Sequence, residues 1–308
     1  MRAEEAHRIA AALGRTLGAT STLAGGFSHE TCLLTLTDGR VVARLGGPDP
    51  AVEAAVMATA RRHVPVPHVL LVTPSPPVMV LEFVAGTPLS RVLSEAEYGP
   101  GSLRDLGAEV GRVVAGIGAV TFERPGFFAD GDLTVKPERP WSEQLPEVAA
   151  ACMAATPDVR LDRVVRRAWT ELCTAHAPAL AGVDGHSRLV HADINPKNIL
   201  VTPTAGGWRV NAVLDWEFAY SGCPYGDAAN MARFGAEYPA GFLDGFQTAF
   251  AAHLADHLPV AREWAYLGHV LDMFALSDLV TRPLGNPVAD QAAERIRQWV
   301  ARGVPASG

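Results

Sequence analysis

One stretch of the chain, residues 189–227, constrains both the fold and the chemistry more than any other. It contains short apolar runs at 189–190, 199–201 and 210–214, which are typical of strands. Polar side chains stand where these runs begin or end. Strand ends beside loops hold reactive groups on a rigid scaffold within reach of a ligand, so the stretch predicts a binding or catalytic site.

Three of these polar residues are Asp193, Asn198 and Asp215. Mg²⁺ takes a few carboxylate or amide oxygens and completes its shell with water and substrate phosphates. A carboxylate close to the metal can orient an attacking hydroxyl and accept its proton, and Asp193, two residues after His191, suits that role. Each residue alone is more often structural. The order HxDxxxxN, followed by Asp at a strand end, is the pattern of phosphoryl transfer in kinase-type enzymes.

The rest of the chain changes character near Val84. Before it the sequence favours β structure, and after it the sequence is mostly helical, so we predict an α+β fold with two domains, 1–84 and 85–308. In the first domain the expected strands are 31–36, 41–45, 69–72 and 78–83, and the expected helices are 4–17 and 51–62. The later expected helices are 102–120, 158–176, 227–233, 240–256, 261–280 and 287–302, with a long loop at 121–147.

Gly25 and Gly26 lie just before the first expected strand hairpin. Glycines at such a bend let backbone amides approach a phosphate closely, although an ordinary turn is the more common reason for a bare Gly-Gly. A GxxxxGK[ST] motif is absent from the sequence, which excludes a Walker-type phosphate loop.

The net charge of −7 makes nucleic acid a poor candidate partner and is compatible with a small cationic substrate. The four cysteines lack a CxxC pair, which argues against a zinc site or a disulfide framework and indicates a reducing compartment. The N-terminal residues carry charges without an apolar signal core, and no apolar segment reaches the roughly 18 residues needed to span a bilayer. We therefore expect a cytoplasmic protein that does not bind membranes.

With these motifs the sequence resembles the aminoglycoside phosphotransferase family, kinase-like enzymes that include antibiotic and choline-type small-molecule kinases. HADINPKN (191–198) resembles the catalytic loop, VLDWEF (213–218) the metal-binding strand end, and VMVLEFVAGTPL (78–89) the hinge between lobes. The resemblance covers nearly the whole chain and implies a bilobal kinase-like fold, with a β-rich N-lobe carrying one key helix and a mainly helical C-lobe. The sequences of the two segments HADINPKN and LDWEFAYSGCPYGD further resemble those of the capreomycin and viomycin phosphotransferases.

The resemblance implies ATP as co-substrate and Mg²⁺ as cofactor. It implies that Asp193 is the base and that Asn198 and Asp215 hold Mg²⁺. His191 and Asp227 would support the catalytic loop. The nucleotide-binding residues that it implies are Gly25, Gly26, Ser28, Arg44, Glu53, Glu82 and Val84.

Within that set, the glycines and Ser28 match the phosphate-covering loop. Arg44 would bind the α and β phosphates and pair with Glu53, and the hinge would meet the adenine edge. Two departures from the commonest pattern stand out: Ala192 replaces a frequent glycine, and Arg44 replaces lysine. Arginine can grip phosphate bidentately but is bulkier than lysine and not equivalent to it.

Glu217 and Asp272 are the predicted contacts to the acceptor, because carboxylates there would attract a cationic compound; a solvated acidic helix face is the alternative for Asp272. The predicted function is ATP-dependent phosphorylation of a hydroxyl on a cationic antibiotic, either an aminoglycoside or a cyclic peptide of the capreomycin and viomycin type, which would confer resistance. A metabolic kinase for choline, another amino alcohol or a sugar is one alternative, and a nucleotide-binding regulator without catalysis is another. A monomer and a homodimer are both compatible with the sequence.

Overall fold

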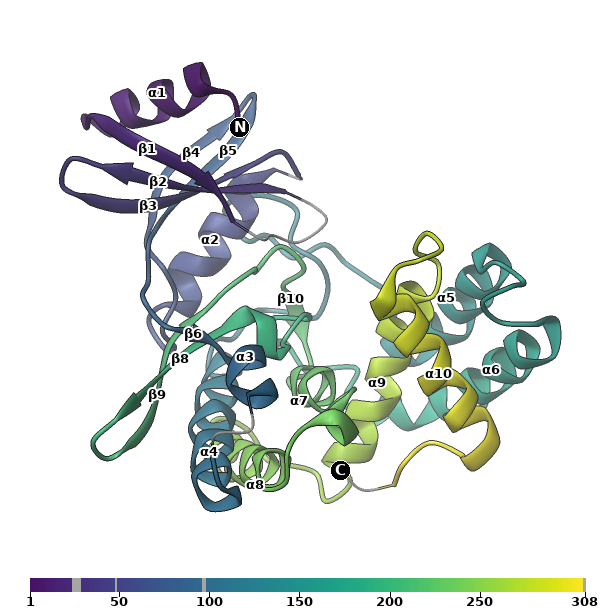
Figure 1. Ribbon diagram of the computed structural model, residues 1–308. Coiled ribbons are helices and arrows are strands. Elements are labelled where there is room, and N and C mark those ends of the chain that lie inside the picture. The colour runs from purple at the N-terminus through teal and green to yellow at the C-terminus, as the bar shows by residue number, and fades with distance from the viewer. Residues whose placement is uncertain (24–28, 48, 96–97, 307–308) are drawn as a thin grey trace.

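A five-stranded antiparallel sheet forms the N-terminal part of the computed structural model, which describes residues 1–23, 29–47, 49–95 and 98–306 (Figure 1). The strands lie in the spatial order β1-β2-β3-β5-β4. Their bounds are β1 Leu17–Thr22, β2 Glu30–Leu36, β3 Gly39–Leu45, β4 Val69–Pro74 and β5 Pro77–Glu82. Two helices belong to this part, α1 Ala3–Ala12 and α2 Pro50–Ala60.

The two faces of the sheet are covered by different helices, as the alternation within β5 shows. Val80 is buried in one cluster with Ile9 of α1, whereas Met79 is buried in another that includes Met57 of α2. Successive side chains of a strand point to opposite faces, so an uninterrupted apolar strand needs a partner on each side. The predicted hairpin at 37–40 is present, since β2 pairs with β3 from Glu30↔Leu45 to Leu36↔Gly39.

The first helix is shorter than the sequence predicted, and a strand follows it. The helix expected over 4–17 ends at Ala12, because Gly14 adopts a left-handed conformation with φ of 69° and turns the chain. Leu17, assigned to the helical stripe, instead opens β1 opposite Leu36.

The C-terminal part is mostly helical and carries two small sheets, ordered β6-β8-β9 and β10-β7. Its helices are α3 Leu89–Ser94, α4 Pro100–Ile117, α5 Trp141–Ala155, α6 Arg163–His176, α7 Tyr225–Ala232, α8 Phe242–Leu254, α9 Trp264–Leu279 and α10 Pro287–Arg302. Its strands are β6 Thr87–Pro88, β7 Arg188–Val190, β8 Ile199–Thr204, β9 Gly207–Val213 and β10 Tyr220–Gly222, and η2, a 3₁₀ turn, spans Pro196–Asn198. The predicted α+β class, with an N-terminal sheet and a helical C-terminal part, is confirmed.

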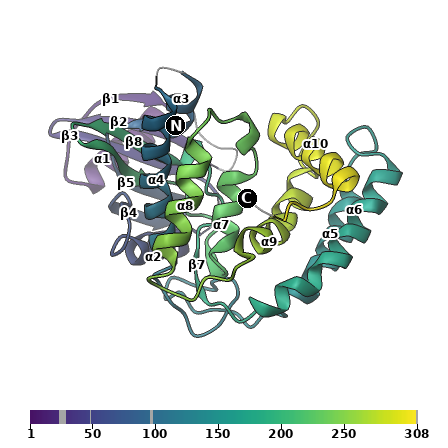
Figure 2. The same cartoon turned by 90° about the horizontal axis from the view of Figure 1, so that it is seen from below.

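Helices α4 and α8 run side by side in very close contact (Figure 2). Gly107 and Gly111 of α4 make this possible, since a Cβ at either position would lie 2.0 or 2.2 Å from the carbonyl oxygen of Phe242 or Phe246 on α8. Any larger residue would push the two backbones apart. The pair supports the β8–β9 hairpin, whose Val210 amide donates to Glu109 on α4.

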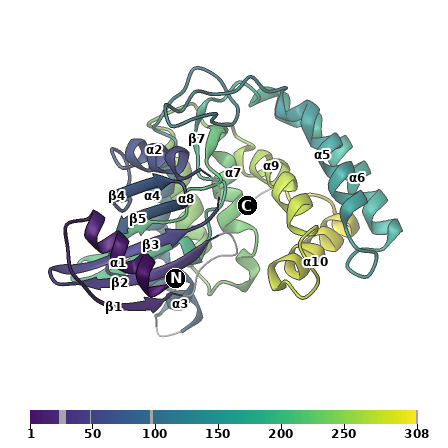
Figure 3. The ribbon, with the colours of Figure 1, turned by 90° about the horizontal axis from the view of Figure 1, so that it is seen from above.

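Part of the predicted loop at 121–147 is helical, because α5 begins at Trp141. Buried residues at a spacing of four, Trp141, Leu145, Ala149 and Met153, form its inner face, and the proline inside it hid that stripe from sequence analysis. Helices α5, α6 and α10 lie together at the end of the molecule away from the sheet (Figure 3).

The sheet ends with β5 at Glu82, and the first helix of the C-terminal part begins at Leu89. The domain boundary placed after residue 84 falls inside this connection and stays a prediction. None of the helices in the described part of the chain is long and apolar enough to cross a bilayer.

Candidate active site

The segment 191–198 forms a tight loop between β7 and β8, and its own sequence explains its shape. Asn195 caps the short η2 turn by accepting from the Lys197 amide at 2.9 Å. Pro196 follows at the first position of the turn, where a missing N–H does no harm. The Asn195 side chain also donates to the Asp193 carbonyl oxygen at 3.0 Å, which holds the chain bent around Asp193.

Asp193 and Asn198 lie in direct contact within this loop. The Asn198 Nδ2 donates to Oδ2 of Asp193 and to the Asp193 carbonyl oxygen, both at 2.9 Å. Because the amide nitrogen makes both bonds, the amide oxygen of Asn198 is the atom that remains for a metal ligand. The contact fixes the position of the Asp193 carboxylate.

Asn198 and Asp215 meet at one end of the β8–β9 hairpin. Ile199 pairs with Val213, and the Leu214 amide donates to the Asn198 carbonyl oxygen at 2.8 Å. Asp215 follows with φ of 66°, a left-handed conformation that turns the chain out of the strand. The three oxygen-bearing residues singled out in the sequence are thus brought together by one loop and one hairpin.

Asp227 and His191 brace the loop from beneath. Asp227, 1% exposed, accepts from the His191 amide at 2.9 Å and from the Ala192 amide at 2.8 Å. The His191 ring accepts from the Asp193 amide at Nδ1, so Nε2 carries the proton and donates to the Leu214 carbonyl oxygen at 2.9 Å. Burial lowers the pKa of His191, which keeps the ring neutral in this bridge.

Arg44 on β3 joins the N-terminal sheet to this site. Its Nη1 contacts Oε1 of Glu53 on α2 at 2.5 Å, and its Nη2 donates to Oδ1 of Asp215 at 2.8 Å. Oε1 of Glu53 also accepts from the Trp216 amide at 3.1 Å. Burial raises the pKa of Glu53, and the charge of Arg44 opposes that shift. The structure therefore places the predicted Arg44–Glu53 pair against the strand end that carries Asp215.

The remaining predicted nucleotide contacts are only partly described. Glu82 and Val84 line a cavity of about 440 Å³ together with residues 61–66 and Asn211. Gly25, Gly26 and Ser28 lie outside the described residues, so their part in covering phosphates stays a prediction.

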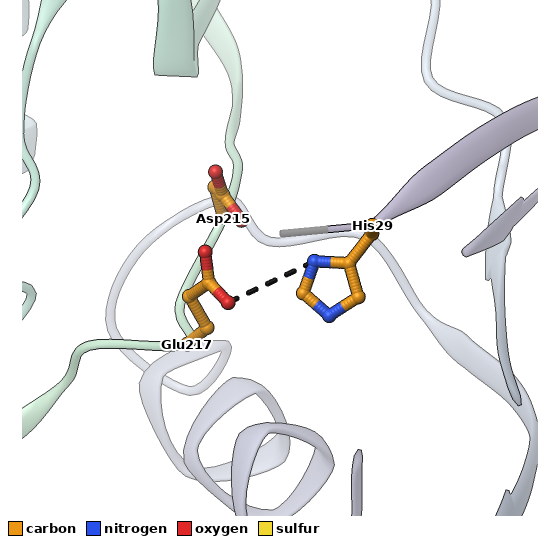
Figure 4. Close-up of side chains that lie close together, drawn as sticks. All are labelled: His29, Asp215 and Glu217. Carbon is orange, nitrogen blue, oxygen red and sulfur yellow. Dashed lines mark ion pairs between the residues drawn. The ribbon is translucent and has the colours of Figure 1, made fainter. Parts of the chain in front are cut away.

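The two predicted acceptor contacts differ in their surroundings. Glu217 follows the strand end closely, and its side chain lies 3.7 Å from the His29 Nδ1 (Figure 4). Asp272 on α9 is 1% exposed and accepts from Asn230 at 2.9 Å and from Arg233 Nε at 3.0 Å. A carboxylate buried this way cannot touch an acceptor in this conformation, so we correct its assignment to a partner of Arg233.

Two residues of this region escaped sequence analysis, His29 and Arg233. Arg233 follows α7 and its side chain is nearly buried. Burial raises the pKa of Asp193, and the positive charge of Arg233 opposes that rise. His29 precedes β2 and accepts from Arg44 Nη2 at 2.9 Å. Arg233 lies in a stretch without a local motif, and His29 directly follows the expected phosphate-covering loop, whose pattern assigned it no role. The tertiary fold brings both to the site.

The donor set fits Mg²⁺ because Asp215 and the amide oxygen of Asn198 are hard oxygen ligands at the same hairpin end. A positive group already lies at Asp215, namely the guanidinium of Arg44. When bound, the ion would neutralise the charge that develops on the transferred phosphate.

We expect the turnover rate kcat to fall with decreasing pH at a higher pH than an exposed aspartate would give. Burial is the largest influence on Asp193 and raises its pKa, with the nearby charge of Asp215 adding to the shift, while Arg233 opposes it. A base must be deprotonated to accept the hydroxyl proton, so activity is lost as pH falls through this raised pKa. Measuring kcat at saturating substrates across pH tests this, and an acid limb near pH ~4, typical of a free aspartate, would contradict it.

Thermal unfolding at the same pH values is the control for this profile. Burial also raises the pKa of Asp227 to about 6. Carboxyls with raised pKa values bind protons more readily in the folded protein, so their contribution to stability grows as pH falls from about 6 towards ~4. Loss of kcat without a lower unfolding temperature in that window reports protonation of the base rather than unfolding.

The sequence profile of the phosphotransferase enzyme family, APH, matches residues 19–264 of the 308. A search of curated proteins found no match. Among solved structures, the chain is similar to a thermostable mutant of the aminoglycoside phosphotransferase APH(4)-Ia in a ternary complex with ADP and hygromycin B. The TM-score is 0.71 and the identity 18%, with coverage of 97% of this chain and 98% of that chain.

Two further solved structures share the fold. Choline kinase LicA from Streptococcus pneumoniae aligns with a TM-score of 0.67 at 16% identity, covering 97% of this chain and 98% of that chain. A putative fructosamine-3-kinase from Thermobifida fusca aligns with a TM-score of 0.63 at 18% identity, covering 95% and 99%. These matches show a shared kinase-like fold, and with the profile match over most of its length, the chain belongs to the phosphotransferase enzyme family.

Proposed function

We propose that this protein transfers the γ-phosphate of ATP to a hydroxyl of a cationic antibiotic and so inactivates it. The observation that carries the transfer is the contact of Asp193 with Asn198, at the hairpin end that holds Asp215. This arrangement supports Asp193 as the base and Asn198 and Asp215 as ligands of Mg²⁺. A regulator without catalysis would have no need of a carboxylate held in this way.

The proposed chemistry depends on position and charge more than on covalent help from the protein. Asn198 would hold the Asp193 carboxylate so that one carboxylate oxygen takes the proton of the acceptor hydroxyl. The hydroxyl oxygen would bond to the γ-phosphorus of ATP as the bond from that phosphorus to the β,γ-bridging oxygen breaks and ADP leaves. Arg44, which Glu53 orients, would bind the α and β phosphates of ATP, and the segment around Glu82 and Val84 would receive adenine.

A cationic acceptor is supported by the negative charge of the chain, which carries a net charge of −7. Overall negative charge attracts a polycation at long range. Glu217 lies two residues after Asp215, but its side chain is only 6% exposed, so the support comes from the overall charge. Within this class we favour aminoglycosides and cyclic peptide antibiotics of the capreomycin and viomycin type. A cationic metabolite such as choline would profit from the same charge, and it is the second candidate.

Purified protein with Mg-ATP should phosphorylate at least one compound in a panel of aminoglycosides, capreomycin and viomycin. Mass spectrometry detects the gain of one phosphate, about 80 daltons. The same assay with choline, other amino alcohols and sugars discriminates the second candidate. Turnover of a metabolite with none of the antibiotics modified would replace our proposal, and phosphorylation of neither group would contradict both.

A further inference from the structure

A cavity of about 440 Å³ lies where the end of α2 meets the connection between the two parts of the molecule. Residues 61–66, which follow α2, line it together with Glu82, Val84 and Asn211. These residues include neither the predicted base nor the predicted metal ligands. Arg61 follows Glu53 by eight positions, which on a helix is about 12 Å, so the cavity lies at the other end of α2 from the Arg44–Glu53 pair (Figure 1).

The guanidinium of Arg61, which lines this cavity, has a nitrogen that the protein leaves unsatisfied. Its Nη1 is buried and has no hydrogen-bond partner in the part of the chain that the structure describes. A buried donor without an acceptor is costly, and the cost is larger for a charged group. A cation at a helix end commonly binds the last carbonyl oxygens, but this nitrogen, directly after α2, makes no such bond. A small turn of the guanidinium would give it an acceptor from a ligand in the cavity.

The charged groups around the cavity favour an anion. Arg62 and His63 are exposed beside Arg61 and add hydrogen-bond donors at the rim. Glu82 supplies the one carboxylate among the described lining residues, and its Oε2 already accepts from the His68 amide at 3.1 Å. Two guanidinium groups against one carboxylate leave the cavity with net positive charge.

The rest of the wall is apolar or already hydrogen-bonded. Pro65 and Val84 are half-buried and offer apolar surface. The Asn211 Nδ2 donates to the Ala85 carbonyl oxygen and to Oγ1 of Thr202, both at 2.6 Å, so this amide is held in place. Pockets for small molecules commonly measure about 300–1,000 Å³ and combine apolar surface with a few polar groups. This cavity meets that description for a compact ligand.

We infer that this cavity binds a small organic phosphate monoester, at a site separate from the one proposed for ATP. A phosphate monoester has three terminal oxygens and up to two negative charges, which suit two adjacent arginines better than a carboxylate does. The apolar wall would receive the organic group. The inference goes beyond the proposed function and does not depend on it. Glu82 and Val84 also belong to the segment proposed to receive adenine, so the test is made with the nucleotide site filled.

The test titrates phenyl phosphate into the full chain saturated with Mg-AMP-PNP, a non-hydrolysable ATP analogue, and measures the heat of binding. The wild type should bind saturably, and Arg61→Gln and Arg62→Gln should each weaken binding by at least about tenfold, as loss of a hydrogen bond from a charged group does. Glu82→Gln should strengthen it by roughly two- to tenfold, because a nearby negative charge is removed. Arg302→Gln is the matched control: Arg302 is exposed at the end of α10, and its loss should leave the affinity unchanged.

Two further compounds test the chemical class of the ligand. Inorganic phosphate lacks the ring, and benzoate has the ring with a single charge, so each should bind at least about fivefold more weakly than phenyl phosphate. Benzoate that binds as tightly would show that the cavity takes carboxylates. Inorganic phosphate that binds as tightly would show that the apolar wall plays no part. Either result would overturn the assignment to an organic phosphate.

Thermal unfolding separates a ligand-binding role of Arg61 from a structural one. Without ligand, Arg61→Gln should unfold at nearly the same temperature as Arg302→Gln, since Nη1 has no partner to lose. Phenyl phosphate should raise the unfolding temperature of the wild type by mass action, and do so much less in Arg61→Gln. If Arg61→Gln does not fold, the exposed Arg62→Gln variant carries the test, and unchanged phenyl phosphate affinity in that variant would overturn the inference.

Binding at the proposed ATP site is the competing explanation, and Arg44 distinguishes it. Arg44→Gln should leave the affinity for phenyl phosphate unchanged, because Arg44 does not line the cavity. A loss in Arg44→Gln, displacement by Mg-AMP-PNP, or no saturable binding up to about 10 mM would each overturn the inference. None of these measurements needs turnover, so a protein that phosphorylates no compound of the panel would still decide this question.

Discussion

Replacing Asp193 by Asn should lower kcat by roughly 10²- to 10⁴-fold, the usual contribution of a positioned base. Asparagine keeps the shape of the side chain and an oxygen that can accept from Asn198 Nδ2, now 2.9 Å from Oδ2 of Asp193. It cannot accept the hydroxyl proton. The measurement is steady-state turnover of an acceptor identified by the antibiotic and metabolite panel, with nucleotide affinity followed by calorimetry.

Nucleotide affinity should change little in this variant, because Arg44 and the hinge residues are untouched. Asp193→Ala should lose at least as much activity, since it also removes the contact with Asn198. Asp38→Asn, on the exposed turn between β2 and β3, is the matched control and should keep full activity. Retention of more than about a tenth of wild-type kcat in Asp193→Asn would show that Asp193 is not the base.

The main division of the fold could be read from periodicity alone. The apolar run at 78–83 predicted a strand, and β5 lies there. The structure adds that α1 and α2 cover its two faces around Val80 and Met79. Sequence periodicity gave a wrong assignment at Leu17, where an apolar residue at helical spacing belongs to a strand. Leu17 continues the helical spacing of α1, yet it pairs in β1, because tertiary pairing with Leu36 outweighs a short local pattern.

The central residues of the candidate site could also be predicted from the sequence, since Asp193, Asn198 and Asp215 lie in one motif. The pairing of Arg44 with Glu53 followed only from the resemblance, and the bond from Arg44 to Asp215 had no sequence signal because 171 positions separate the two residues. Asp272 was misread because helical spacing cannot say whether a carboxylate on α9 faces solvent or Arg233.

Backbone conformation at single residues was the property hardest to predict from the sequence. Ala192 adopts φ of 68°, which explains why glycine is frequent there in the family that the sequence resembles. A non-glycine residue in this region stores on the order of 1–3 kcal/mol and persists only where its surroundings hold it. The Ala192 amide donates to the buried carboxylate of Asp227, and this hydrogen bond helps to hold Ala192 in its strained conformation.

Replacing Asp227 by Ala should lower the free energy of unfolding by roughly 2–6 kcal/mol, because it leaves two buried amides, those of His191 and Ala192, without an acceptor at about 1–3 kcal/mol each. Urea unfolding followed by circular dichroism measures the change. The strained loop would relax once both bonds are lost, so kcat should fall as well, although Asp227 contacts no substrate.

Asp227→Asn tests the same bonds in a graded way. Its single oxygen can satisfy one amide while its NH₂ group faces the other, so the loss should lie between those of the wild type and the alanine variant. Asp244→Asn is the control: Asp244 forms an exposed ion pair with Arg104, and such pairs contribute at most about 1 kcal/mol. If both Asp227 variants lower kcat while stability stays within that margin, the bracing role is wrong, and Asp227 acts on the chemistry through the charge it places beneath His191 and Asp193.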